Sequence, residues 1–224
     1  MKTYKILLVS AALVSSSFAA TAIQSPVAVT GSTLGDNVDA PLSSIVDGSG
    51  LSNPFSSGST SFGGYFASDP QHQFDSGFYT SPMTYLGEIH LDMGMNVLAS
   101  AFAIWFDPLA PLTSFALYGS LNADFSDSSL LTQNDSPWAT PNWADDFSSY
   151  TYGATSSTFG PKLVRYLKLE VAGVAPAPDG LASLTIGEVA VGVEKPSTNV
   201  PDSTSTLALL GAGLSLVCLL RRRS

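Results

Sequence analysis

Short stretches of alternating apolar and polar residues run through the middle of the chain, and clusters of Gly, Pro, Ser, Asn and Asp separate them. A period of two is typical of half-buried β-strands. In the stretch at residues 85–93 the alternation puts apolar side chains on one face and polar ones on the other: Tyr85, Ile89, Leu91 and Met93 against Glu88, His90 and Asp92. No amphipathic helix is evident between residues 23 and 199, so the pattern predicts an all-β fold.

Further strands are expected at residues 102–106, 114–120, 163–171 and 184–193. In one of them, 163–171, the side chains expected to share the buried face are Leu163, Leu167, Leu169 and Val171. Several short strands with loops between them and no intervening helices favour a sandwich. We therefore predict a single jelly-roll β-sandwich over residues 23–194.

Two segments, 49–79 and 132–160, are rich in Ser, Gly, Asp and aromatic residues and are expected to be long loops. Structureless loops longer than about 12–15 residues are uncommon in compact domains unless they are functional or disordered. Binding residues are therefore sought there. For Phe62, Tyr65 and Phe66 two interpretations stay open: a binding surface, or a small core that pins the loop.

Residues 1–22 have the order of a secretory signal peptide. Lys2 and Lys5 precede an apolar run from Ile6 to Val14, and the triplet 20–22, Ala-Thr-Ala, suits signal peptidase. We expect export, with cleavage after Ala20 or Ala22. A permanent N-terminal anchor is the alternative, but the apolar run is too short to span a bilayer.

An apolar stretch of 15 residues, Thr206 to Leu220, lies near the other end of the chain. As a helix it would be about 22 Å long, against a hydrocarbon core of about 30 Å. This predicts a marginal membrane helix. Its stop signal is Arg221, Arg222 and Arg223, which favour the cytoplasmic side, so the body would lie across the membrane.

Directly before this helix stands a polar motif: Val200, Pro201, Asp202 and Ser203. Motif, apolar helix and terminal arginines together resemble the VPDSG-CTERM variant of the PEP-CTERM sorting signals, although Thr204 replaces the usual Gly. The resemblance implies that residues 200–224 are recognised by an exosortase, a membrane-embedded transpeptidase. Cleavage near the motif would pass the body to the cell surface or extracellular matrix, with 195–199 as linker. An ordinary tail anchor is the alternative.

The body is strongly acidic, with four bases against seventeen acids between residues 23 and 199. Nucleic acid is therefore not expected as a partner, because phosphate binding needs clustered Lys and Arg. The only cysteine of the sequence, Cys218, lies in the apolar tail. The body thus has no thiol for a disulfide, a nucleophile or a thiolate metal site.

Five pieces of the body occur in the order found in the discoidin, or F5/8 type C, branch of galactose-binding-like jelly rolls, at residues 45–48, 88–94, 115–120, 164–169 and 186–191. The body resembles that family, but the tryptophan usual after the early Asp-Gly turn is not obvious here. The resemblance implies a structural Ca²⁺ held by Asp47 and Glu188, whose hard oxygens suit this ion. Alternatively, Asp47 only caps a turn and Glu188 pairs with a base such as Arg165.

A carbohydrate site needs aromatic faces and a few fixed polar groups. The candidate ligand-binding residues are Trp138, Asn142, Trp143, Tyr150 and Tyr152. The large side chains could instead pack into a minor core. Motifs of hydrolases, zinc proteases and phosphate-binding loops are lacking from the sequence. We therefore expect a non-catalytic protein that binds carbohydrate or exopolysaccharide, with a purely structural matrix protein or, less favoured, a glycan hydrolase as alternatives.

Overall fold

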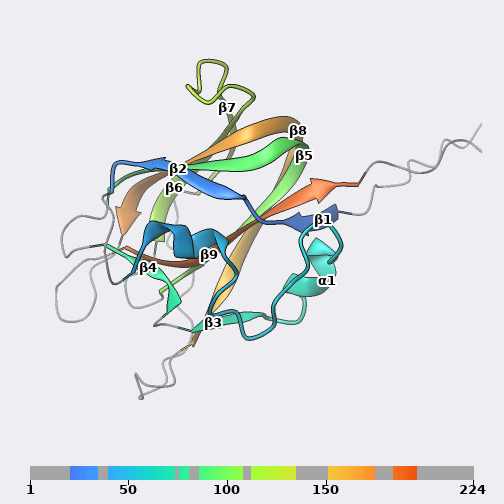
Figure 1. Ribbon diagram of the computed structural model, residues 1–224, viewed down its shortest axis with the longest axis vertical. Coiled ribbons are helices and arrows are strands. Elements are labelled where there is room, and N and C mark those ends of the chain that lie inside the picture. Colours follow the sequence, from blue (N-terminus) through green and yellow to red (C-terminus); the bar gives the residue numbers. More distant parts are fainter. Residues whose placement is uncertain are drawn as a thin grey trace, which may run out of the picture.

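The computed structural model describes residues 21–34, 40–73, 76–80, 86–107, 112–134, 151–174 and 184–195. These residues form β-strands with two short helices (Figure 1). The elements are β1 (Thr21–Gln24), β2 (Ala28–Ser32), η1 (Leu42–Val46), α1 (Phe62–Phe66), β3 (Gln71–Gln73), β4 (Phe78–Tyr79), β5 (Gly87–Phe106), β6 (Leu112–Ser120), β7 (Ser129–Asn134), β8 (Thr151–Val174) and β9 (Thr185–Glu194).

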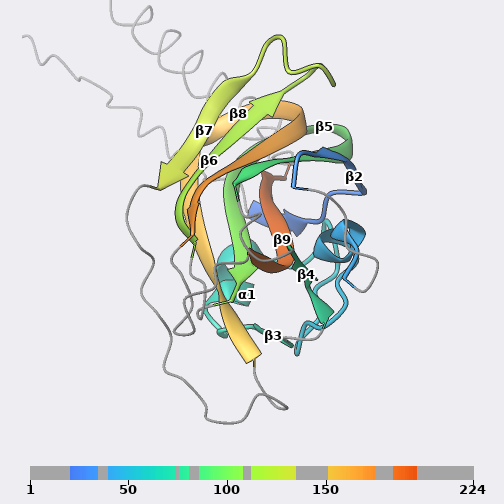
Figure 2. The ribbon, with the colours of Figure 1, turned by 90° about the vertical axis from the view of Figure 1, so that its left-hand side faces the viewer.

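All strand pairs are antiparallel, in the order β1-β9-β5-β8-β6-β7, with β2 paired to β5, β3 to β8 and β4 to β9. The long strands β5 and β8 are bent, and Figure 2 shows β6 and β7 on one side of the molecule with β9 and β4 on the other. The side chains between these layers form the main core. The prediction of an all-β, jelly-roll type sandwich is confirmed.

The alternation in β5 is confirmed where it was predicted. Ile89, Leu91 and Met93 are buried in the core, whereas Glu88 and His90 are half-buried on the opposite face. The strand is longer than expected, because residues 85–93 and 102–106 were predicted as separate strands. In the structure, β5 alone covers residues 87–93 and 102–106. Its pairing with β8 has an irregularity between Asp92 and Val97, but the pairing resumes afterwards and the strand continues.

The same irregularity explains an incorrect prediction in β8. Leu167, Leu169 and Val171 are buried as expected, but Leu163 is 54% exposed. Val164 is buried in its place. On β5, Asp92 and Val97 are five positions apart, whereas their partners on β8, Tyr166 and Val164, are only two positions apart. The pleat is therefore not continuous, and strict alternation fails at this point.

The segment 49–79 is not structureless, since it contains α1, β3 and β4. Its aromatic side chains Phe62 and Tyr65 are buried in a second cluster, against which Phe66 packs. Trp105 belongs to this cluster, contacts the rings of Tyr65 and Phe66, and donates its indole N–H to the Pro70 carbonyl at 2.9 Å. The interpretation of these aromatic residues as a small core that pins the segment is therefore confirmed.

Candidate functional site

A glycine-rich turn after η1 meets the middle of β9. Asp47 ends η1, and its carboxylate accepts a hydrogen bond from the N–H of Ser49 at 2.7 Å. Gly48 has a φ of +74°, a conformation that suits glycine. Its N–H donates to the Glu188 carboxylate at 2.8 Å. Glu188 thus joins the turn to β9. The resemblance had predicted that Glu188 acts together with Asp47.

The Glu188 side chain is fully buried, and its Oε1 atom has no hydrogen-bond partner within the described residues. The pKa of Glu188 is raised to about 9, mainly by burial and also by the negative charge of Asp47, and the hydrogen bond from Gly48 acts in the opposite direction. Without a cation the carboxyl group is therefore neutral at pH 7. A buried oxygen that lacks a donor is a costly feature unless something else compensates it.

His72 packs beside this turn. It is buried, its Nδ1 lies 2.7 Å from the Gln73 carbonyl oxygen, and its Nε2 has no partner in the part of the chain that the structure describes. A Cβ atom at Gly50 or Gly187 would lie 2.6 Å from the imidazole ring. The ring therefore fills the space that these two glycines leave, and burial lowers the pKa of His72.

The candidate metal ligands at this turn are the carboxylate oxygens of Asp47 and Glu188. Groups of three or more His, Cys, Asp or Glu side chains that could hold a metal are absent from the described residues. The unpartnered Oε1 of Glu188 and the exposed Asp47 carboxylate are oxygen donors of the type that Ca²⁺ takes. The alternative gave Asp47 the role of a turn cap and paired Glu188 with a base such as Arg165. Asp47 does cap the turn through Ser49, but the pairing with Arg165 is wrong, because Arg165 binds Asp92 through two hydrogen bonds of 3.1 and 3.2 Å.

Of the predicted carbohydrate contacts, Trp138, Asn142, Trp143 and Tyr150 lie outside the described residues. Tyr152 is described and is buried, with its ring stacked on His72 at 5.3 Å between centroids. Residues 71–73 of β3 pair with 151–153 of β8 around it. Tyr152 thus fixes the point at which the chain from 135–150 joins the sheet, beside the turn that carries Asp47.

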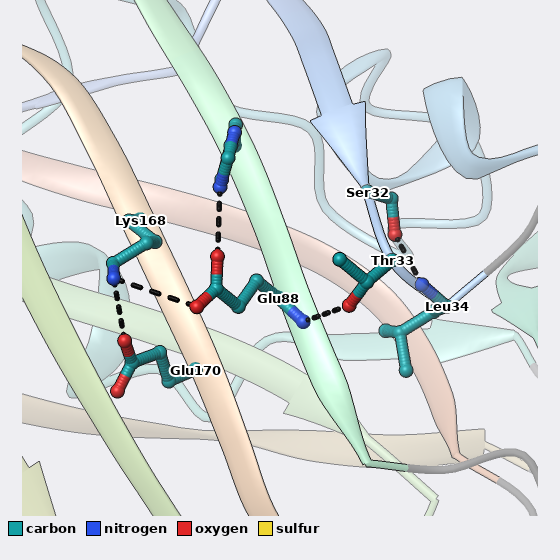
Figure 3. Close-up of polar contacts among 7 residues, drawn as sticks. Ser32, Thr33, Leu34, Glu88, Lys168 and Glu170 are labelled. Carbon is teal, nitrogen blue, oxygen red and sulfur yellow. Dashed lines mark hydrogen bonds and ion pairs between the residues drawn. The ribbon is translucent and has the colours of Figure 1, made fainter. Parts of the chain in front are cut away.

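A polar stripe crosses the outer face of β5 and β8. Lys168 Nζ lies 3.5 Å from Glu88 Oε1 and 2.5 Å from Glu170 Oε1, and His90 Nε2 lies 3.1 Å from Glu88 Oε2 (Figure 3). The hydrogen bond from His90 is the largest cause that lowers the pKa of Glu88. Because these groups lie at a solvated surface where water and salt screen them, each pair contributes less than about 1 kcal/mol. The stripe thus links side chains of the neighbouring strands β5 and β8.

The residues predicted for sorting, Val200, Pro201, Asp202, Ser203, Arg221, Arg222 and Arg223, also lie outside the described residues. Within the part of the chain that the structure describes, no helix is both long and apolar enough to cross a membrane.

The chain was compared with family models, curated proteins and solved structures. Residues 199–224 match the model of the VPDSG-CTERM motif. The search of curated proteins found no match.

Among solved structures, the family 32 carbohydrate-binding module from Streptococcus pneumoniae EndoD is similar, with a TM-score of 0.51 and 13% identity over 75% of this chain and 95% of that chain. CBM32-1 from a family 31 glycoside hydrolase of Clostridium perfringens has 17% identity over 77% of this chain and 97% of that chain, with a TM-score of 0.48. A family 32 module from C. perfringens NanJ, solved in complex with galactose, has 14% identity over 77% and 98% of the two chains and a TM-score of 0.42. The chain therefore combines a VPDSG-CTERM motif at its carboxyl end with a body that has the galactose-binding-like fold of family 32 carbohydrate-binding modules.

Proposed function

We propose that this protein is exported, sorted to the cell surface or extracellular matrix, and binds carbohydrate there without turning it over. The observation that carries the sorting step is the match of residues 199–224 to the VPDSG-CTERM motif. The fold of a carbohydrate-binding module supports the binding step, although a fold alone does not dictate function.

The glycan contacts are proposed for Trp138, Trp143, Tyr150 and Asn142. Aromatic faces pack against the C–H surface of a sugar ring, and the amide fixes its hydroxyl groups. The support from the described residues is indirect: the chain rejoins the sheet at Tyr152, whose packing on His72 gives a binding loop a rigid base. Tyr152 itself acts as a positioning residue because it is buried.

The binding step is tested by pulldown of the purified protein on insoluble polysaccharides and on the cell's own exopolymer. Trp138→Ala and Trp143→Ala should each weaken retention at least about tenfold, as expected when a central aromatic contact is lost. Tyr79→Ala is the matched control, because Tyr79 is an exposed aromatic residue on β4 and outside the proposed site. Equal retention of all variants would assign the glycan contacts to other residues, whereas no retention of the unaltered protein would favour a purely structural role. Release of reducing sugar would favour a hydrolase.

A structural Ca²⁺ ion is proposed at the turn after η1. Asp47 and Glu188 would hold it, and the ion would supply the positive charge that the buried Glu188 carboxylate lacks. Its effect would be to keep the turn fixed against β9 rather than to take part in a reaction.

Export is proposed to use signal peptidase, with cleavage after Ala20 rather than Ala22. Thr21 and Ala22 belong to β1 and pair with Glu194 and Val193 of β9. Ala22 is also buried in the main core. Cleavage after Ala20 would retain these contacts, whereas cleavage after Ala22 would remove half of β1.

An exosortase is proposed to recognise Val200 to Ser203, while the apolar helix and arginines hold the chain in the membrane transiently. Deletion of the exosortase should leave the full-length chain in the membrane fraction. Unchanged appearance at the surface in the deletion strain would contradict this step.

A further inference from the structure

A groove of about 1100 Å³ opens at the end of the body where the described chain begins and ends. Its walls are mainly apolar and come from α1, β5, β8 and β9. Thr21, the first residue of β1, and Lys195, which follows β9 directly, both line it. Figure 1 shows β1, α1 and the end of β9 on one side of the molecule, away from η1 and β4.

Three large apolar side chains are exposed beside this groove. Met95 is 60% exposed and Leu98 is 40% exposed, and both line the groove. Leu163, 54% exposed, lies opposite Leu98 in the pairing of β5 with β8. We call these three residues the terminal apolar patch. Exposed apolar side chains that gather in one region commonly mark a site of protein or membrane interaction.

The bases at this end are placed differently from the others in the body. Lys168 is bound to Glu88 and Glu170, and Arg165 is bound to Asp92. Lys162 is exposed next to Leu163, and Lys195 lies at the groove. Within the described residues, neither of these two lysines forms a salt bridge. Lys162 and Lys195 therefore place two positive charges beside the terminal apolar patch, where Glu194 is the acidic residue that lines the groove.

The chain itself indicates what covers this patch. From Lys195 to the apolar stretch that begins at Thr206 there are ten residues, 196–205. Fully extended, they reach about 33–36 Å at most. When the apolar stretch is in the membrane, the groove end of the body is thus the part of the molecule tethered closest to the lipid. Apolar side chains with adjacent lysines match the interface of a bilayer that contains anionic lipid.

We propose that the terminal apolar patch rests on the lipid surface while the protein is anchored, an inference that depends on the proposed sorting function. In this orientation the turn with Asp47 and Glu188 is directed away from the bilayer. The motif at Val200 to Ser203 begins five positions after Lys195, so it is held at the interface, where a membrane-embedded transpeptidase can reach it.

The test uses the full-length chain reconstituted in vesicles of phosphatidylethanolamine and phosphatidylglycerol. A fluorophore is attached at Leu163→Cys in a Cys218→Ser background, and at Leu86→Cys as the control. Leu86 is 55% exposed and directly precedes the first pair of the β5–β8 ladder, Gly87 with Val171, whereas Leu163 lies in the middle of that ladder. The two positions therefore match in residue type and exposure but differ in place. A third sample carries the fluorophore on the native Cys218 and reports whether the tail has inserted.

With vesicles, quenching of the 163 label by iodide should fall at least about threefold, as expected for shallow interfacial burial, and a lipid-borne quencher should reach it. The label at 86 should remain fully open to iodide. If the label at 218 is protected but the label at 163 is not, the inference fails and the sorting proposal stands. If the label at 218 is unprotected, membrane anchoring fails and the inference fails with it. Protection of the label at 163 from iodide in the absence of vesicles would also overturn the inference. Protection that is lost on dilution would mean that a second copy of the protein covers the patch, and protection that is independent of dilution would mean that the protein's own chain covers it.

Discussion

The backbone N–H of Gly48 donates to the buried carboxylate of Glu188 at 2.8 Å, across 140 positions of sequence. This contact joins the turn after η1 to β9, and the other carboxylate oxygen, Oε1, has no partner among the described residues. The protonation of one side chain is thereby linked to the position of the turn. Three of the predictions below concern the stability of this region.

Stability should depend on pH through Glu188. The ordinary pKa of the side chain is 4.5, and burial in the folded state raises it to about 9. Between these values the folded protein binds more protons than the unfolded chain, so the stabilisation is complete below the lower value and is lost as pH rises towards the upper one. In calcium-free buffer the free energy of unfolding should fall by roughly 5 kcal/mol between about pH 5 and pH 9.

Urea denaturation across this pH range measures the effect, and Glu188→Gln should flatten the curve because the amide does not titrate. Glu170→Gln is the control, since Glu170 is partly exposed at the surface stripe. A pH slope that persists unchanged in Glu188→Gln would assign the dependence to other groups.

Calcium should stabilise the protein. At a hundredfold excess over the dissociation constant, a ligand that binds only the folded state adds about 2.7 kcal/mol. For a chain of this size, that corresponds to a rise in Tm of roughly 5–10 °C. Differential scanning calorimetry with calcium and with a chelator should show this rise, and Asp47→Asn or Glu188→Gln should abolish it. Identical Tm values with and without chelator would contradict the proposed calcium site.

Gly187→Ala should destabilise the fold, because the new Cβ would lie 2.6 Å from the His72 ring in a site without free space. Overpacking of this kind costs about 1–3 kcal/mol. Gly160→Ala is the matched control, since nothing lies within 4 Å of a Cβ atom there. Comparison of urea midpoints decides the matter: equal midpoints for the two variants would mean that His72 moves aside without cost.

The mature N-terminus should be Thr21. Cleavage at this point retains the pairing of Thr21 with Glu194 and of Ala22 with Val193. Mass spectrometry of the exported protein should therefore find an N-terminal peptide that begins at Thr21. A peptide that begins at Ile23 would show that the body folds without the first half of β1.

The sequence predicted those features that depend on local pattern. The buried face of β5 at Ile89, Leu91 and Met93 follows from alternation alone, and Asp47 and Glu188 were paired through a resemblance. The exposure of Leu163 could not be predicted, because it depends on where the pairing of two strands is interrupted.

His72 was missed for a related reason. Its burial results from the pairing of β3 with β8, about 80 positions further on, and a strand of three residues carries no periodic signal. The space for the imidazole ring comes from two glycines far apart in the sequence, Gly50 and Gly187, which have no side chains to fill it. Such long-range complementarity becomes visible only in the folded structure.

The central claim is that the carboxyl end is a sorting segment that is removed when the protein reaches the surface. The most direct measurement is mass spectrometry of the C-terminal peptides of the protein isolated from the cell-surface fraction. The account predicts that these peptides end at or shortly after Val200 to Ser203, with no peptide from Leu207 to Arg223. Mature surface protein that retains Leu207 to Arg223 would contradict it.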